Sequence, residues 1–296
     1  MMAIDSTLQH EYDSFGPWLL EIKQPQDVPR VFAEDFQLTD DILMALKVPR
    51  PIERRDARPG QVLYDGIVCL YDREVKILHL EQQQVLVESA CYKDMVTIQD
   101  VRDLLMGELR IQTDSRSYSI PYSMVSQEMV DRVVRILRKK YIRSDILIKL
   151  EDENFPNVEL PLLFKNALNK LRANEKISLL AYQPNMALEG NSSDDYERFE
   201  NIYNNYTLYC SLFLSAEREI IVISSNKPIK RRMEVDSSYI LSYIPYSQLR
   251  DMQIEKDSRF IGLRHLLLKF GHQNLEFMLD QNTTRKIRVH VLDRVQ

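Results

Sequence analysis

The sequence predicts a mainly β protein with helices, of the α+β class, in which two strand-rich blocks follow one another and each ends in a helix. Three observations predict this class. The chain has 296 residues, which is enough for two domains that each bury a core. Apolar and polar residues alternate with a period of two along several segments, as is typical of strands. Each block then closes with apolar residues at helical spacing.

The first block follows an N-terminal extension. Residues 1–59 are rich in proline and acidic residues, and we expect one short helix within them, over 39–46. Alternating runs such as 109–112 then predict strands. Residues 125–141 place apolar residues at helical spacing, with basic residues between them, and predict a long amphipathic helix. We therefore expect a first domain over 60–150.

The second block, over 151–296, has the same order of strands followed by a helix. Its polar and acidic segment 184–205 predicts an inserted loop. The remaining expected elements are a connecting helix over 157–171, strands over 177–182, 208–214 and 220–223, a hairpin over 266–279 and a closing helix over 283–295.

Short matches between the blocks indicate an internal repeat. Residues 73–75 match 218–220 at an offset of 145 (218 − 73), and residues 101–103 match 249–251 at an offset of 148 (249 − 101). True repeats keep nearly constant offsets apart from loop insertions. We therefore expect the two blocks to share one fold.

A set of strands closed by one amphipathic helix, and duplicated over 60–141 and 176–295, resembles the bacterial pleckstrin-homology-like domain family. The residues that carry the resemblance include the turn 71–74 and the apolar run 212–214, which leads into 220–223. The resemblance implies two tandem domains, each a bent β-sandwich or barrel closed by a C-terminal helix. It also implies no enzyme activity and no fixed catalytic residues, because related domains serve as platforms for proteins, peptides or lipid headgroups. We expect no cofactor.

Composition argues against several functional classes. The net charge is −5, whereas nucleic-acid-binding domains usually carry a basic surplus, so we expect no nucleic-acid partner. Only 7 residues are glycine, which disfavours glycine-cradled nucleotide sites. The 3 cysteines lack paired spacing and indicate free thiols in a reducing compartment. The chain starts without signal-peptide features and contains no run long enough to span a membrane, so we expect a cytoplasmic location.

Two basic clusters are candidates for an anionic or protein partner. We favour the alternative that they are a solvated helix face and a charged hairpin tip that discourages aggregation, because the apolar stripe already explains the helix. The first cluster lies on the predicted helix 125–141, and the second lies in one loop. The candidate residues are Arg132, Arg135, Arg138, Lys139 and Lys140, and Lys227, Lys230, Arg231 and Arg232.

Catalytic and metal-binding patterns are sparse. Cys91 could be an activated thiolate and His265 a base, but a small buried hydrophobe and a core histidine explain them as well. No Cys-x-x-Cys or His-x-x-x-His spacing occurs, so we expect no metal site. Trp18, the only tryptophan, is a candidate anchor for another protein, or it docks the extension onto its own domain.

Together these patterns predict a non-catalytic cytoplasmic binding or scaffold module. Its expected partners are proteins or peptides, or a second copy of the chain. The alternative is peripheral attachment to an anionic membrane through the two basic clusters, which we disfavour because neither cluster alone is a strong signal. A hydrolase or transferase with an unrecognised site is the third hypothesis. It would require a pocket that holds polar groups with perturbed pKa values.

Overall fold

The computed structural model describes residues 6–142, 150, 159–191, 206–231, 234 and 237–295. Within these residues the protein is mainly β with helices, as the sequence predicts. The chain divides into two compact units. The first comprises Met1–Met95, Leu105–Leu109 and Ser119–Tyr141, and the second comprises Val96–Leu104, Arg110–Tyr118 and Ile142–Gln296.

The first unit contains an antiparallel five-stranded sheet in the order β1-β2-β3-β4-β5. Helix α2 closes this part of the chain, as expected for residues 125–141. The elements up to this helix are α1 (Ser6–Ser14), β1 (Leu20–Glu21), β2 (Met44–Pro49), β3 (Tyr64–Leu70), β4 (Glu74–Glu81), β5 (Gln84–Cys91), β6 (Met95–Arg102), β7 (Met106–Thr113), β8 (Ser117–Ser123) and α2 (Gln127–Tyr141). Of these, β6 after Met95 belongs to the second unit, and β7 and β8 are divided between the two units.

The N-terminal residues form part of the core of this unit. Phe15 and Phe32 are buried in one apolar cluster with Ile67 and Leu78, which lie on the five-stranded sheet. The helix expected over 39–46 is wrong, because Met44–Pro49 forms strand β2, which pairs with β3. Tertiary pairing decides the conformation here, since a short run with helical spacing has little helical stability of its own.

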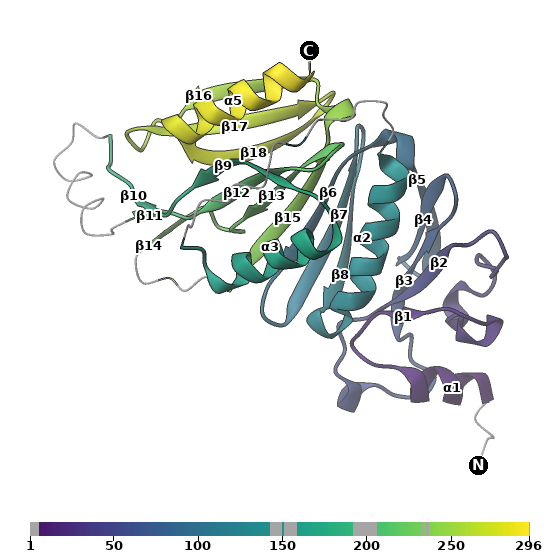
Figure 1. The fold of residues 1–296 in the computed structure, drawn as a ribbon. Helices are drawn as coiled ribbons and strands as arrows, with labels where there is room; N and C mark the ends of the chain where they lie inside the picture. Colours follow the sequence, from purple (N-terminus) through teal and green to yellow (C-terminus); the bar gives the residue numbers. More distant parts are fainter. Residues whose placement is uncertain are drawn as a thin grey trace. The chain divides into compact units, whose positions relative to one another are not determined.

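The second unit contains strands of the seven-stranded sheet β8-β7-β6-β15-β13-β12-β9, together with two three-stranded sheets in the orders β10-β11-β14 and β16-β17-β18. Helix α5 packs on β17 and β18 (Figure 1). The bounds are α3 (Leu162–Asn174), β9 (Ser178–Gln183), β10 (Met186–Ala187), β11 (Tyr206–Leu208), β12 (Ser211–Ser215), β13 (Glu219–Ser224), β14 (Ile229–Arg231), β15 (Tyr239–Pro245), β16 (Asp251–Lys256), β17 (Leu263–Phe270), β18 (Gln273–Asp280) and α5 (Gln281–Val295).

Most elements expected in this part of the sequence are present. The hairpin is β17–β18 and the closing helix is α5, but the single strand expected over 208–214 is divided between β11 and β12. The segment expected as a loop over 184–205 contributes β10, and its residues 192–205 lie outside the described part of the chain. The sheets are open and have two edge strands each, so they are not closed barrels.

Strands β3, β4 and β5 of the first unit pair with one another in the same way as β12, β13 and β15 of the second unit. In the first unit Val68 pairs with Ile77, and in the second Phe213 pairs with Val222, an offset of 145 in both strands (213 − 68 and 222 − 77). The third strands correspond at an offset of 154, because Glu74 pairs with Cys91 whereas Glu219 pairs with Pro245 (245 − 91). The match of residues 73–75 with 218–220 therefore marks equivalent positions.

The turn that follows each trio is also equivalent. The backbone N–H of Tyr92 donates to the carbonyl of Arg73, and that of Tyr246 donates to Arg218. A single 3₁₀ turn follows in both cases, Tyr92–Asp94 and Tyr246–Gln248. The sequence match of 101–103 with 249–251 does not mark equivalent positions, because the former residues end β6 whereas the latter precede and begin β16.

Candidate functional site

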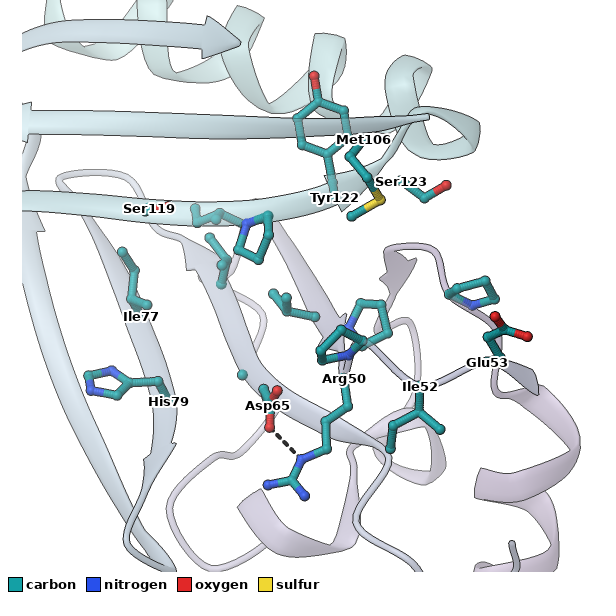
Figure 2. Close-up of a pocket in the computed structure, with 18 of the residues that line it drawn as sticks. Arg50, Ile52, Glu53, Asp65, Ile77, His79, Met106, Ser119, Tyr122 and Ser123 are labelled. Atoms are coloured by element: carbon teal, nitrogen blue, oxygen red, sulfur yellow. Dashed lines mark hydrogen bonds and ion pairs between the residues drawn. The ribbon is translucent and has the colours of Figure 1, made fainter. Parts of the chain in front are cut away.

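The first unit contains a mostly apolar cavity of about 820 Å³. Figure 2 shows β8 along one side of the cavity and β4 along another, with the segment after β2 nearby. Several lining residues, including Pro51, Met106 and Pro121, are exposed, so the cavity opens to solvent. Its lining comprises Pro17, Val48–Arg54, Asp65, Gly66, Val68, Ile77–His79, Leu105, Met106 and Ser119–Ser123. The volume is in the range of small-ligand pockets, roughly 300–1,000 Å³.

We call this cavity the groove. Its walls depend on two glycines that other parts of the chain approach closely, Gly66 and Gly107. A Cβ atom at Gly66 would lie 2.8 Å from the carbonyl oxygen of Leu78. A Cβ atom at Gly107 would lie 2.2 Å from the ring of Tyr122, which lines the groove. Glycine at these positions therefore lets β4 and the Tyr122 ring sit where they form the walls.

Charged groups of both signs lie around the groove. The guanidinium of Arg50 donates to the carboxylate of Asp65 at 2.5 Å, the ion pair drawn in Figure 2. The guanidinium carbon of Arg54 lies 4.1 Å from the centre of the Tyr12 ring, and its Nη1 is buried without a hydrogen-bond partner among the described residues. A cation held against an aromatic ring needs no carboxylate beside it. The lining of the groove thus includes two arginines and two carboxylates, Asp65 and Glu53.

The groove lies at a position where the second unit has a phenylalanine. Phe213 has the same register position as Val68, and its ring packs edge-on against Phe277 with centroids 5.1 Å apart. Phe213 and Phe277 belong to a continuous apolar core that also includes Ile287 of α5. Val68 is 2% exposed and lines the groove, and its side chain is smaller than that of phenylalanine. One side-chain difference therefore contributes directly to the groove.

Basic residues of α2 are partly engaged by acidic residues of the first unit. Arg132 donates to Glu21 at 3.1 Å, and Lys140 pairs with Asp72. Arg135 and Lys139 are exposed on the helix. The contact with Lys140 also lowers the pKa of the Asp72 carboxyl, because a hydrogen bond and the ammonium charge both favour the ionised form. Arg138, the remaining residue of this predicted cluster, is half-buried.

The second predicted cluster contains one buried and two exposed cations among its described residues. Lys230 is 2% exposed, and its ammonium lies 4.4 Å from the centre of the Tyr209 ring. Burial and the charge of Lys227 lower the pKa of Lys230 to about 8. Lys227 and Arg231 are exposed, and Arg232 lies outside the described residues.

Trp18 is partly exposed, whereas its neighbours Phe15 and Leu19 are buried and hold the N-terminal segment in place. Its neighbour Leu19 is 4% exposed, whereas Trp18 is 38% exposed. The indole ring lies over Gly16, where an added Cβ atom would be 2.2 Å from it. The segment is thus fixed by Leu19, and by Phe15 in the apolar cluster, while the indole keeps a solvent-facing surface.

His265 and the cysteines have surroundings that disfavour a catalytic role. The two ring nitrogens of His265 contact the carboxylates of Glu276 and Asp257, the latter at 2.8 Å, so neither nitrogen remains for another ligand. Burial raises the pKa of the Cys69 thiol to about 12 and that of the Cys210 thiol to about 11, which disfavours the nucleophilic thiolate. Cys91, the candidate thiolate, is a half-buried free cysteine at the end of β5.

Sequence reasoning did not find the groove. Its lining comes from separate strands and a proline-containing segment, none of which has a recognisable motif. One usable signal was present, because the 145-residue offset places Val68 opposite Phe213 in an alignment of the two blocks. A loss of aromatic volume at an equivalent core position predicts a cavity.

No helix in the described part of the chain is both long and apolar enough to cross a membrane. No protein-family model matches the sequence, and a comparison with curated proteins finds no match either.

Proposed function

We propose that the protein is a non-catalytic binding module of two tandem pleckstrin-homology-like strand sets, and that the groove of the first set binds an extended peptide segment of a protein partner. An apolar side chain of the peptide enters the groove. The observation that carries the proposal is the solvent-open apolar groove of about 820 Å³ at a position where the second unit is filled by Phe213.

The order of elements supports the tandem architecture. Four strands, a 3₁₀ turn, three strands and a helix follow one another twice along the chain: β2 to β5, then β6 to β8 and α2, and β9, β12, β13 and β15, then β16 to β18 and α5. The additional strands β10, β11 and β14 form a separate small sheet in the second copy. A duplicated domain in which one copy keeps a filled core and the other an open groove is suited to binding by one copy.

Three features of the groove favour a peptide. Its volume accommodates a large apolar side chain, and the burial of such a chain contributes about 1.5–3 kcal/mol. The charges around it, Arg50 with Asp65, have both signs and suit a neutral backbone better than an anionic headgroup. Strand β8, which lines the groove, is the end strand of its sheet, so a peptide can lie beside it while a side chain enters the groove.

The anionic-membrane alternative has weaker support. In α2, Arg132 and Lys140 are paired with acidic residues, and Lys230 of the second cluster is buried. Stable electrostatic attachment normally needs several accessible basic residues acting together. We therefore expect no pelleting with phosphatidylserine-containing vesicles at physiological salt. Robust pelleting that is lost on replacing Arg135 and Lys139 with Gln would favour the membrane function instead.

Selection from a phage-displayed library of random peptides tests the proposal. We expect enriched peptides with a shared apolar position that bind the parent protein. Val68→Phe, which fills the groove, should weaken their binding by at least about tenfold. Val125→Phe is the matched control, because Val125 is 78% exposed and does not line the groove.

Ser119→Trp provides a second blocking variant, because Ser119 is an exposed lining residue whose replacement does not alter the buried core. Thermal melts of each variant verify folding. Failure to enrich any peptide, or full binding by folded Val68→Phe and Ser119→Trp proteins, would contradict the proposed function.

A further inference from the structure

One strand pairing in the second unit joins the two strand sets. Strands β15 and β6 pair antiparallel, with Leu241 opposite Asp100 and Ser242 opposite Gln99. The side-chain amide of Gln99 donates to the hydroxyl of Ser242 at 3.1 Å. The strand before the 3₁₀ turn of the second set is therefore joined to the strand after the 3₁₀ turn of the first set.

Strand β5 of the first set corresponds to β15, and strand β16 of the second set corresponds to β6, but neither takes part in this junction. Strand β5 precedes the turn Tyr92–Asp94 and β16 follows the turn Tyr246–Gln248. Both are end strands of their sheets within the described residues. Within the described residues, each chain thus contains one junction of this type, and β5 and β16 each pair with a strand on one side only.

Strand β5 lacks the usual protection of an edge strand. Its eight residues, Gln84–Cys91, contain neither proline nor lysine. Leu86 and Val87 are 40% and 52% exposed, respectively. By contrast, Pro121 interrupts the backbone donors of the end strand β8. Glu88 is the one charged residue of β5, so this edge has little of the charge that normally discourages pairing with another strand.

The backbone of β5 has the alternation that a junction requires. The N–H of Tyr92 donates to Arg73 beside β4, and antiparallel strands alternate in the direction of their hydrogen-bonding groups. Val87 lies five positions before Tyr92 (92 − 87), an odd separation, so the N–H of Val87 points away from β4. The same holds for Leu241 of β15, because the N–H of Tyr246 donates to Arg218.

Strand β16 has the matching alternation. The N–H of Asp257 donates to Leu263 on the β17 side, so the N–H of Ile254 points away from β17. The N–H of Met252, which points the same way, is accepted at 2.8 Å by the side chain of Asp251 rather than by a strand. This edge is therefore free of strand partners within the described residues.

We propose that β5 of one copy pairs with β16 of a second copy, in the register by which β15 pairs with β6. Transfer of the register through the offset of 154 residues (246 − 92) places Val87 opposite Ile254 and Leu86 opposite Glu255. It also places Glu88 opposite Gln253, in the position of the Ser242–Gln99 pair. An apolar pair at the centre and an amide opposite a carboxylate are favourable cross-strand partners.

This contact joins two different surfaces. It leaves β16 of one copy and β5 of the other unused, so association continues head to tail instead of ending at a twofold dimer. The inference stands independently of the groove, because no residue that it uses lines the groove. The partner is a second copy of this chain.

Sedimentation velocity of the full chain, from low micromolar to several hundred micromolar, tests the proposal. We expect the weight-average mass of the parent to rise with concentration through species larger than a dimer. Val87→Pro removes the outward N–H of β5 without removing a donor to β4, and should sediment as a monomer. Val87→Thr keeps this N–H and is the matched control, which should associate like the parent.

Ile254→Pro blocks the other edge and should also be monomeric alone. Because the Ile254 side chain partly packs on the core, Lys256→Pro, at an exposed residue, serves as a second blocked variant if Ile254→Pro melts early. Mixing a β5-blocked with a β16-blocked protein should give a one-to-one dimer that grows no further, because one intact junction remains. A parent that stays monomeric throughout, a folded blocked variant that still associates, or a mixture that remains monomeric would overturn the proposal.

Discussion

Phe213 packs edge-on against Phe277 in the second unit, with ring centroids 5.1 Å apart and planes at 74°. At the register position of Phe213, the first unit has Val68, and a groove of about 820 Å³ lies beside it. The same strand arrangement thus encloses a filled core in one case and an open space in the other. Substitutions at Val68 and Phe213 therefore test how much each side chain contributes to the stability of the protein.

Val68→Phe should raise the stability of the protein. The larger side chain enters existing space instead of displacing neighbours, and cavity filling commonly adds about 0.5–2 kcal/mol to the free energy of unfolding. Denaturant titration measures the change. A loss of more than about 1 kcal/mol would indicate overpacking and therefore a groove that cannot admit an aromatic ring.

Phe213→Ala should lower the free energy of unfolding by about 3–5 kcal/mol, because it opens a cavity in a packed core and removes the ring contact with Phe277. Thermal and denaturant melts provide the measurement. Val289→Ala is a suitable control, because Val289 is 52% exposed on α5 and its truncation should have little effect. Equal effects of the two substitutions would contradict the contrast between a filled second unit and an open first unit.

The His265 contacts predict a pH-dependent contribution to stability. Burial lowers the pKa of His265, but the hydrogen bonds with Glu276 and Asp257 outweigh burial and raise it above its ordinary value. The stabilisation is therefore fully present below the unfolded-state pKa, about 6.5, and is lost as the pH rises through the higher folded-state pKa.

Unfolding titrations of the parent and His265→Gln between pH 5 and pH 9 measure this effect. The free-energy difference between the two proteins should be largest at the acidic end and should decrease with increasing pH. A difference that stays constant over the range would show that the histidine acts by packing alone.

Gly16→Ala should displace the Trp18 ring, because the new Cβ atom would lie 2.2 Å from a ring carbon. Trp18 is the only tryptophan, so its fluorescence reports on this segment alone. We expect a red shift of the emission as the indole enters solvent. Gly60→Ala is the control: it places alanine at a φ of +83° with no atom within 4 Å, and should affect stability but not emission.

Local periodicity was sufficient to predict the long helix and much of the strand content. In α2, Val130, Val133 and Leu137 are buried, as their helical spacing predicts. Residues 39–46 could not be assigned in this way. Met44–Pro49 is a strand because it pairs with β3, and even Lys47 is buried there, where its ammonium donates to the carbonyl of Asp27 at 3.0 Å. Such pairing is not encoded in the periodicity of a short segment.

The candidate site was harder to predict than the fold. A basic cluster in sequence indicates a charged surface, yet Lys230 is buried against Tyr209 and Lys140 is paired with Asp72. The groove, by contrast, is a space left between strands, and a space has no residue pattern. Only the comparison of Val68 with Phe213 through the repeat offset contains information about it.

In the proposed complex, an apolar side chain of the peptide enters the groove. Methyl NMR of the isotopically labelled full chain, titrated with a peptide from the phage selection, tests it most directly. We expect the largest shifts, and intermolecular nuclear Overhauser effects to the peptide's apolar side chain, at the methyl groups of Val68, Ile77 and Ile120, which line the groove. Binding that leaves these methyl groups unshifted and perturbs residues elsewhere would contradict the account.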